Sequence, residues 1–154
     1  MLYTVGEMAK KLDMPTSTLR YYDKEGLLPF VERSGGGMRM FRDEDIEWLK
    51  VIGCLKKAGM KLTDIKRFIE MAMAGDETIS QRLDLIAAQR KEVEAQIQAM
   101  NQTLATLKFK EWYYTTAKQD GSTDRVRNMP SEQIPPEFWQ VRAELKGDTV
   151  NQSK

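Results

Sequence analysis

The chain has 154 residues, 41% of them hydrophobic, and its 24 Lys and Arg residues nearly balance its 23 Asp and Glu residues. Because it has one cysteine and no histidine, a Cys/His metal site is disfavoured and the commonest general base is missing, so we expect no enzyme, no catalytic residues, no metal and no cofactor. No apolar run approaches the length of a membrane span and residues 1–15 lack a secretory signal pattern, so we expect a cytoplasmic protein without membrane contact.

The N-terminal residues predict a helix-turn-helix. Thr4 and Glu7 have the spacing of a capping box, and apolar residues follow at helical spacing. The sequence Asp-Met-Pro then ends this helix. Since proline suits the first position of a helix, we expect a second helix from Pro15 or Thr16 to near Gly26. In such a pair, the start of the second helix enters the major groove of DNA.

The second helix carries more polar and aromatic side chains than a core helix needs. Its leading end and one flank present groups that can reach phosphates and base edges, namely Thr16, Ser17 and Arg20. Tyr21 and Tyr22 offer phenolic hydroxyls to phosphate oxygens. Alternatively, both tyrosines pack in the core of a small helical domain with their polar tips in water.

The segment FVERSGGGMRMFRDED predicts a two-stranded hairpin with a glycine-rich tip. A hairpin after a helix-turn-helix is a wing. Arg33 and Arg39 lie on its two arms and Arg42 just beyond, where they would place positive charge along the DNA backbone or a minor groove. An ordinary surface hairpin fits the same pattern.

Two further helices are expected after the wing. The first, in DEDIEWLKVIGCLKKAG, ends at Gly59, and its predicted buried stripe is Trp48, Val51, Ile52 and Leu55. The second, in LTDIKRFIEMAMAG, has Thr63 as its predicted cap and Gly75 as its predicted stop.

Two stretches of the chain resemble the DNA-binding region of the MerR family of bacterial transcriptional regulators. They are YTVGEMAKKLDMPTSTLRYYDKEGLL and GMRMFRDEDIEWLKVIGCLKKAGMKLTDIKRFI. The resemblance implies that five residues occupy DNA-contacting positions: Arg20, Tyr21, Tyr22, Arg39 and Lys56. Met38 and Phe41 stand where the family has wing tyrosines.

A long helix is expected from Thr78 to Gly121, because no Gly or Pro interrupts this stretch and Thr78 and Gln81 form a second predicted capping box. Eight of its ten seam positions in a heptad pattern are apolar, including the predicted dimerisation residues Leu83, Ile86, Val93, Ile97, Met100, Leu104 and Leu107. The pattern favours a coiled coil with a second copy of the chain. The alternative is packing against its own C-terminal region.

The C-terminal residues give weaker signals. The stretch KQDGSTDR predicts a loop, a short helix is possible after Pro136, and DTVNQSK is expected to form a loose tail. Five aromatic residues could line a small pocket, although an aromatic contact that caps the coiled coil is the simpler arrangement: Trp112, Tyr113, Tyr114, Phe138 and Trp139.

Cys54 is the candidate sensor residue. A lone cysteine in a helix is usually a small buried hydrophobe. Cys54, however, lies off the predicted stripe, and its neighbours Lys50 and Lys57 would favour the reactive thiolate. The segment EWLKVIGCLKKAGM also resembles a branch of the family in which a cysteine at this place senses aldehydes or nitrosative stress. Both interpretations stay open.

The expected fold class is therefore all-α with a small β-hairpin wing. We expect a winged helix-turn-helix domain over residues 1–76, a dimerisation coiled coil over 77–116, which is antiparallel in the resembled family, and a tail over 117–154. The resemblance implies a homodimer that binds a palindromic promoter in double-stranded DNA and distorts it in response to a signal, with RNA polymerase as an indirect partner. The alternative is a coiled-coil interaction protein that uses the helix-turn-helix as a protein-docking surface.

Overall fold

The computed structural model describes residues 1–151, with side chains through Lys146, and they form two compact units. The first unit is Met1–Val93 and the second begins at Glu94, so the division falls inside the longest helix. The boundaries predicted at residues 76 and 116 follow sequence pattern and stay predictions. Within the described part of the chain, no helix has both the length and the apolar character that crossing a membrane requires.

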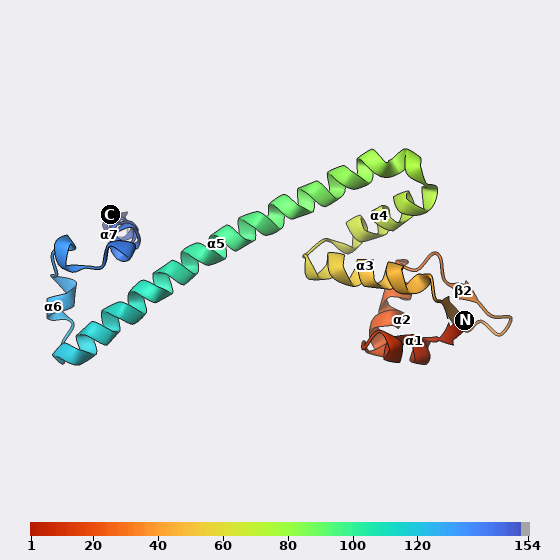
Figure 1. Ribbon diagram of the computed structural model, residues 1–154, viewed down its shortest axis with the longest axis horizontal. Coiled ribbons are helices and arrows are strands. Elements are labelled where there is room, and N and C mark those ends of the chain that lie inside the picture. The colour runs from red at the N-terminus through yellow and green to blue at the C-terminus, as the bar shows by residue number, and fades with distance from the viewer. Residues whose placement is uncertain (152–154) are drawn as a thin grey trace. The chain divides into compact units, whose positions relative to one another are not determined.

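The first unit begins with the predicted helix-turn-helix, α1 (Val5–Lys11) and α2 (Thr16–Lys24) (Figure 1). The first capping box is confirmed. The Glu7 backbone N–H donates to Thr4 Oγ1 at 3.4 Å, and the Thr4 N–H donates to the Glu7 carboxylate at 2.8 Å. Pro15 is the extended N-cap residue of α2, as expected for a position that ends one helix and allows another to start.

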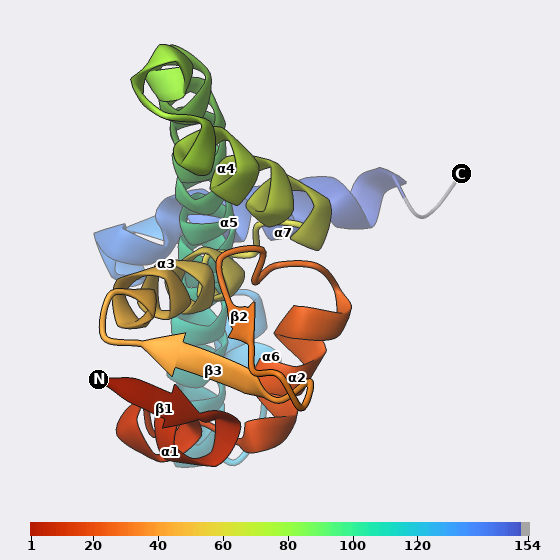
Figure 2. The same ribbon diagram turned by 90° about the vertical axis from the view of Figure 1, so that its right-hand side faces the viewer.

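A three-stranded antiparallel sheet contains the predicted wing (Figure 2). β2 (Glu32–Arg33) and β3 (Arg39–Arg42) form the hairpin, and β1 (Leu2–Thr4) pairs with the other edge of β3. The Ser34 N–H donates to the Met38 carbonyl at 2.7 Å and closes the hairpin turn. Only the hairpin is predicted from the sequence. β1 is missed because three residues are too few to show an alternating pattern.

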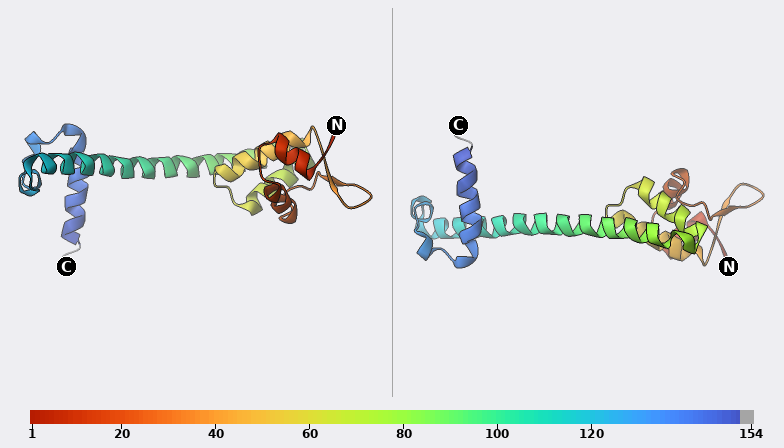
Figure 3. Two further views of the ribbon diagram at one scale, coloured as in Figure 1. Left: turned by 90° about the horizontal axis from the view of Figure 1, so that it is seen from below. Right: turned by 90° about the horizontal axis from the view of Figure 1, so that it is seen from above.

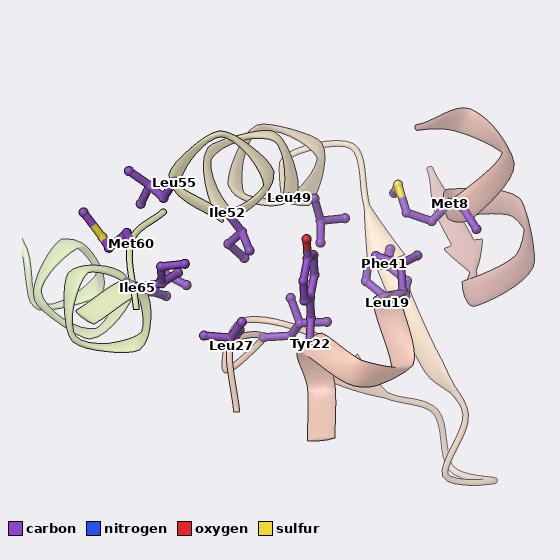
Figure 4. Packing of buried hydrophobic residues seen from close by; sticks show 13 residues of the cluster. Met8, Leu19, Tyr22, Leu27, Phe41, Leu49, Ile52, Leu55, Met60 and Ile65 are labelled. Carbon is purple, nitrogen blue, oxygen red and sulfur yellow. The ribbon is translucent and has the colours of Figure 1, made fainter. Parts of the chain in front are cut away.

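The core of the first unit joins α1, α2 and β3 to α3 (Asp45–Lys57) and α4 (Leu62–Ala74). Its largest fully buried side chains are Met8, Leu19, Leu27, Phe41, Leu49, Ile52, Ile65 and Ile69. In Figure 4, Leu49 and Ile52 point from α3 toward Tyr22 and Leu27 of the segment that begins with α2. The core therefore fixes α3 against the second helix of the helix-turn-helix.

The inward face of α3 differs from the predicted stripe. Its buried apolar residues are Leu49, Ile52 and Leu55. The prediction is wrong for Val51, which is 37% exposed, and Trp48 is only partly buried, with its ring stacked on that of Phe30 at 5.7 Å between centroids. Residues at both 48 and 49 recur at helical spacing with 52 and 55, so periodicity cannot choose between them and packing against other elements decides.

The next two helices begin differently from the prediction. The N-cap residue of α4 is Lys61, so the predicted cap Thr63 lies inside the first turn. A short 3-10 turn, η1 (Asp76–Thr78), precedes α5 (Ile79–Asp120). The Thr78 hydroxyl lies 2.5 Å from the Met71 carbonyl oxygen. It is thus tied to the preceding turn and does not form the predicted capping box with Gln81.

The predicted ends of these helices, in contrast, are confirmed. Gly59, Gly75 and Gly121 follow α3, α4 and α5, with φ angles of +80°, +105° and +73°. Such left-handed backbone is unstrained for glycine. α5 is one uninterrupted helix of 42 residues.

The second unit packs short helices on the last turns of α5. They are α6 (Asp124–Arg127), η2 (Ser131–Gln133), η3 (Pro136–Phe138) and α7 (Trp139–Asn151), and Figure 3 shows α7 in dark blue lying across α5. The expected loop at residues 118–125 is limited to the turn at 121–123, since α5 continues to Asp120. The expected loose tail is helical through residue 151, and residues 152–154 lie outside the described residues.

An aromatic cluster joins α5 to the C-terminal helices. The ring of Phe138 lies 5.8 Å from that of Phe109 and 5.6 Å from that of Trp112. The aromatic contact expected here is therefore present, with Phe109 as a member that the prediction omits. Tyr114 and Trp139 are largely exposed, although the Trp139 indole N–H donates to the Ile134 carbonyl at 2.9 Å.

Asp45 is a charged side chain that is buried at the start of α3, with 4% of its surface exposed. Its carboxylate accepts the Arg42 backbone N–H at 2.7 Å. Burial raises the pKa of Asp45, and the hydrogen bond from Arg42 opposes this effect. The buried charge is therefore a cost to stability at neutral pH.

We expect Asp45→Asn to raise the free energy of unfolding at neutral pH. The gain in the free energy of unfolding should be about 1 kcal/mol or less. It is limited because the positive N-terminus of α3 stabilises the negative charge by about 0.3–1 kcal/mol, and the variant loses this contribution. The pKa of Asp45 is higher in the folded than in the unfolded state. The parent therefore loses stability as the pH rises through the interval between these two pKa values. Urea titrations should thus show a difference at neutral pH that closes near pH 4. A variant less stable than the parent at neutral pH would contradict this.

Candidate nucleic-acid interface

The leading end of α2 presents a polar face. Thr16, Ser17 and Arg20 are exposed, whereas Leu19 and Tyr22 turn into the core. Pro15 supplies no side-chain cap to the first N–H groups of α2. Free N–H groups at a helix start and an exposed guanidinium both suit phosphate oxygens or base edges.

The two tyrosines of α2 have different environments. Tyr21 is 39% exposed, whereas Tyr22 is 4% exposed and its hydroxyl points toward α3 in Figure 4. Burial, and next the neighbouring Tyr21, raise the pKa of Tyr22, so its phenol keeps its proton. The core-packing alternative therefore describes Tyr22, and Tyr21 is the tyrosine that is open to a ligand.

Lys56 of α3 lies beside these tyrosines. Its Nζ atom is 5.0 Å from the ring centroid of Tyr21 and 5.7 Å from that of Tyr22. Cation–π attraction at such distances holds the ammonium group over the rings. The fold thus brings together residues from two helices that the resemblance assigns to DNA contact.

A basic recess of about 820 Å³ opens between the end of α1, α2 and α3. Its rim includes four lysines, Lys11, Lys50, Lys56 and Lys57, and also Tyr22 and Cys54. Asp13 is the acidic residue on the same rim. The charge of the recess suits a polyanion. Only Lys50 and Lys57 are predicted around Cys54. Lys11 comes from another helix, α1, and Lys56 lies two residues from Cys54 in α3, outside the i−4 and i+3 spacings on which the prediction rests.

Cys54 is exposed at this recess. Its thiol is therefore not a small buried hydrophobe, and a reagent can reach it. The described residues contain no group of three or more His, Cys, Asp or Glu side chains that could hold a metal ion.

The arginines of the wing pair with carboxylates. Asp23 of α2 pairs with Arg39 and also with Arg33, at 3.3 Å. Arg42 pairs with Glu32 at 2.7 Å. The wing is thus less positive than its arginines alone suggest. Asp23 is missed from the sequence, since a single acidic residue in a helix gives no signal of its partners.

The predicted dimerisation residues lie along α5, and most are uncovered in the single chain. The exposed ones are Leu83, Ile86, Ile97, Met100, Leu104 and Leu107, while Val93 is half-buried. Leu85 is turned instead to the core of the first unit, and the Gln89 side chain donates to the Ala58 carbonyl at 2.7 Å.

Two family models match the chain. One is described as "MerR HTH family regulatory protein" and covers residues 3–72, and the other is described as "MerR, DNA binding" and covers residues 46–108. Together they span the helix-turn-helix, the wing, α3, α4 and most of α5.

Known proteins of similar sequence are transcriptional regulators. An HTH-type transcriptional regulator of Haemophilus influenzae is 47% identical over 135 residues, which are 88% of this chain and 98% of that protein. The regulator AdhR of Bacillus subtilis is 32% identical over 87 residues, 56% of this chain and 62% of its own length.

Two solved structures that are similar to this chain are those of MerR family regulators. The crystal structure of HiNmlR, a MerR family regulator lacking the sensor domain, bound to promoter DNA, matches with a TM-score of 0.70 at 47% identity over 88% of this chain and 100% of that one. A MerR family regulator from Bacillus thuringiensis matches with a TM-score of 0.63 at 42% identity over 71% of this chain and 96% of that one.

Proposed function

Since the chain belongs to the MerR family of helix-turn-helix transcriptional regulators and is thus a DNA-binding regulator, we propose that it binds a palindromic promoter as a homodimer and distorts it in response to a signal. The observation that carries the proposal is the contact between exposed Tyr21 of α2 and Lys56 of α3. Lys56 also lines the basic recess, and Arg20, which precedes Tyr21 in α2, is exposed. The promoter-bound structure of the similar HiNmlR supports it.

DNA binding would divide the work between two kinds of contact. Lys56 and Tyr21 are suited to phosphates, which fix the position of the protein without reading sequence. Arg20, with Thr16 and Ser17, is placed to read base edges in the major groove. The lysines of the recess add attraction to the backbone and make the affinity fall with salt.

The partner of the exposed face of α5 is a second copy of the chain. Apolar residues recur there at heptad spacing over most of the helix, and each fully covered one contributes about 1.5–3 kcal/mol. A two-fold dimer presents two copies of α2 to the DNA, so its site should be palindromic, with half-sites about one helical turn or a multiple apart.

Distortion of the promoter is within reach of these contacts. Bending a site of 20–30 base pairs costs about 1–6 kcal/mol. In the mechanism implied by the family, the distortion aligns promoter elements for RNA polymerase, which is then an indirect partner. This work takes place in the compartment that holds the DNA, which we propose to be the cytoplasm.

The proposed signal is an electrophile that reacts with Cys54. The thiol is exposed in the recess with Lys50, Lys56 and Lys57. An adduct would change the bulk of a surface that also holds a proposed phosphate contact. The resulting shift of α3 would alter the relative orientation of the DNA-binding domains of the two protomers in the dimer.

Arg20→Ala tests the proposed reading of DNA. The probe is a duplex with the sequence upstream of the gene that encodes this protein, the upstream promoter duplex. We expect the variant to bind it more weakly by about 1–3 kcal/mol, because one bidentate contact to a base is lost. Gel-shift titrations over a salt series measure this effect. The parent should also bind random duplex DNA with an affinity that falls steeply with salt.

The matched control is Arg67→Ala, which removes the same charge from the exposed surface of α4. It should bind the promoter nearly as the parent does. Equal affinity of Arg20→Ala and parent would rule out base reading by Arg20. A parent that binds neither duplex would favour the protein-docking alternative.

A further inference from the structure

Asp23 lies on the last turn of α2, and its side chain faces the two strands of the wing. Its side chain is 15% exposed and accepts hydrogen bonds from Arg39 and, at 3.3 Å, from Arg33. Arg33 and Arg39 are direct partners across the β2–β3 ladder. One carboxylate of the helix thus holds an arginine from each arm of the wing.

The carboxylate offsets a repulsion that the wing creates by itself. Side chains of directly opposed residues lie on the same face of an antiparallel pair, and two like charges there are destabilising. The hydrogen bond from Arg39, together with the charges of both arginines, keeps the pKa of Asp23 below its usual range, so the negative charge persists at neutral pH.

The Arg39 guanidinium contacts Asp23 through one nitrogen, Nη2. Its Nε atom is buried and has no hydrogen-bond partner within residues 1–151. Farther along β3, Phe41 is fully buried in the core and anchors that end of the strand. The arms that carry Arg33 and Arg39, and the glycine-rich tip beyond them, extend from this anchor toward solvent.

We propose that Asp23 is a positioning residue for DNA recognition. It fixes the wing against α2, so that the helix and the wing contact the duplex in one fixed relative orientation. The inference rests on the proposed function. A carboxylate on a DNA-binding helix repels phosphates. Its direct electrostatic effect on affinity is therefore unfavourable, and opposite in sign to its effect through positioning.

This opposition of signs makes Asp23→Asn a decisive variant. Removal of one negative charge should tighten binding to random duplex DNA or leave it unchanged. We expect affinity for the upstream promoter duplex to fall by roughly tenfold, which corresponds to about 1.4 kcal/mol. The ratio of the two affinities is a readout that a loss of stability alone does not move, provided that circular dichroism shows a folded protein.

Two further variants separate positioning from charge. Asp23→Glu keeps the charge but moves it by one methylene, so it should also lose promoter affinity. If Asp23 acts through Arg39, the double variant Asp23→Asn, Arg39→Gln should bind the promoter no more weakly than the weaker single variant, because coupled residues are not additive.

The outcomes are distinct. If Asp23→Asn tightens promoter binding as much as random binding, or leaves both unchanged, Asp23 does not position the wing. If Asp23→Asn fails to fold, Asp23→Glu decides: parental promoter affinity overturns the inference, and a selective loss supports it. If the parent itself does not bind the promoter duplex, the proposed function fails, whatever the variants do.

Discussion

Ile97→Asp should convert the protein into a monomer and weaken promoter binding by roughly 10²–10⁴-fold, the usual advantage of two linked binding units. Ile97 lies at the centre of the proposed seam and is 55% exposed in the single chain. In a two-fold dimer both copies would bury an unpaired carboxylate, which is far costlier than the loss of two apolar side chains. Sedimentation at micromolar concentration and gel-shift titration measure the two effects.

The control for this variant is Gln98→Asp, which adds the same charge one residue further along α5. Gln98 is exposed and lies outside the seam positions, so this variant should remain a dimer. A dimeric Ile97→Asp protein would show that the seam is assigned wrongly, and the exposed apolar row of α5 would then need another partner.

Cys54→Ser should abolish the response to electrophiles in a promoter-reporter assay while promoter binding stays at the parental level. Serine keeps the size of the side chain but lacks its nucleophilicity. With an aldehyde, the thiol adds across the C=O double bond: the sulfur bonds to the carbonyl carbon, the C=O bond becomes a single bond, and the thiol proton is transferred to the oxygen, which gives a hemithioacetal. Because Cys54 is the only cysteine, mass spectrometry of the treated parent assigns a thiol adduct without ambiguity.

A rate measurement complements the reporter assay. We expect Cys54, which is exposed in the basic recess, to react with a neutral disulfide reagent faster than free cysteine does. A slower reaction, or a serine variant that responds as the parent does, would exclude Cys54 as the sensor.

Most features that depend on neighbouring residues could be predicted from the sequence, although the predicted caps at Thr63 and at Thr78 with Gln81 were wrong. The capping box at Thr4, the helix start after Pro15 and the stops at Gly59, Gly75 and Gly121 each follow from a few adjacent residues, and the structure has all of them. The length of α5 was predictable for the same reason, since the sequence contains nothing that interrupts it.

Features that depend on distant partners could not be predicted. β1 exists because β3 offers it an edge, and Leu49 is buried in preference to Val51 because of the elements that pack on α3. Tyr22 and Asp23 are adjacent in α2, yet one faces the core and the other faces the wing. No local sequence pattern distinguishes these environments. The residues of the candidate interface could therefore be identified in full only from the fold.

The pairing of β1 with β3 has a consequence for the order of folding. It joins Leu2 to Arg42 and Thr4 to Met40, whereas α1 and α2 meet across a short turn. Closing a longer loop costs more chain entropy before any contact compensates it. We therefore expect the helices to assemble early and the sheet to close late. For the same reason, we expect the amides that pair β1 with β3 to exchange through local opening while the helical core remains protected.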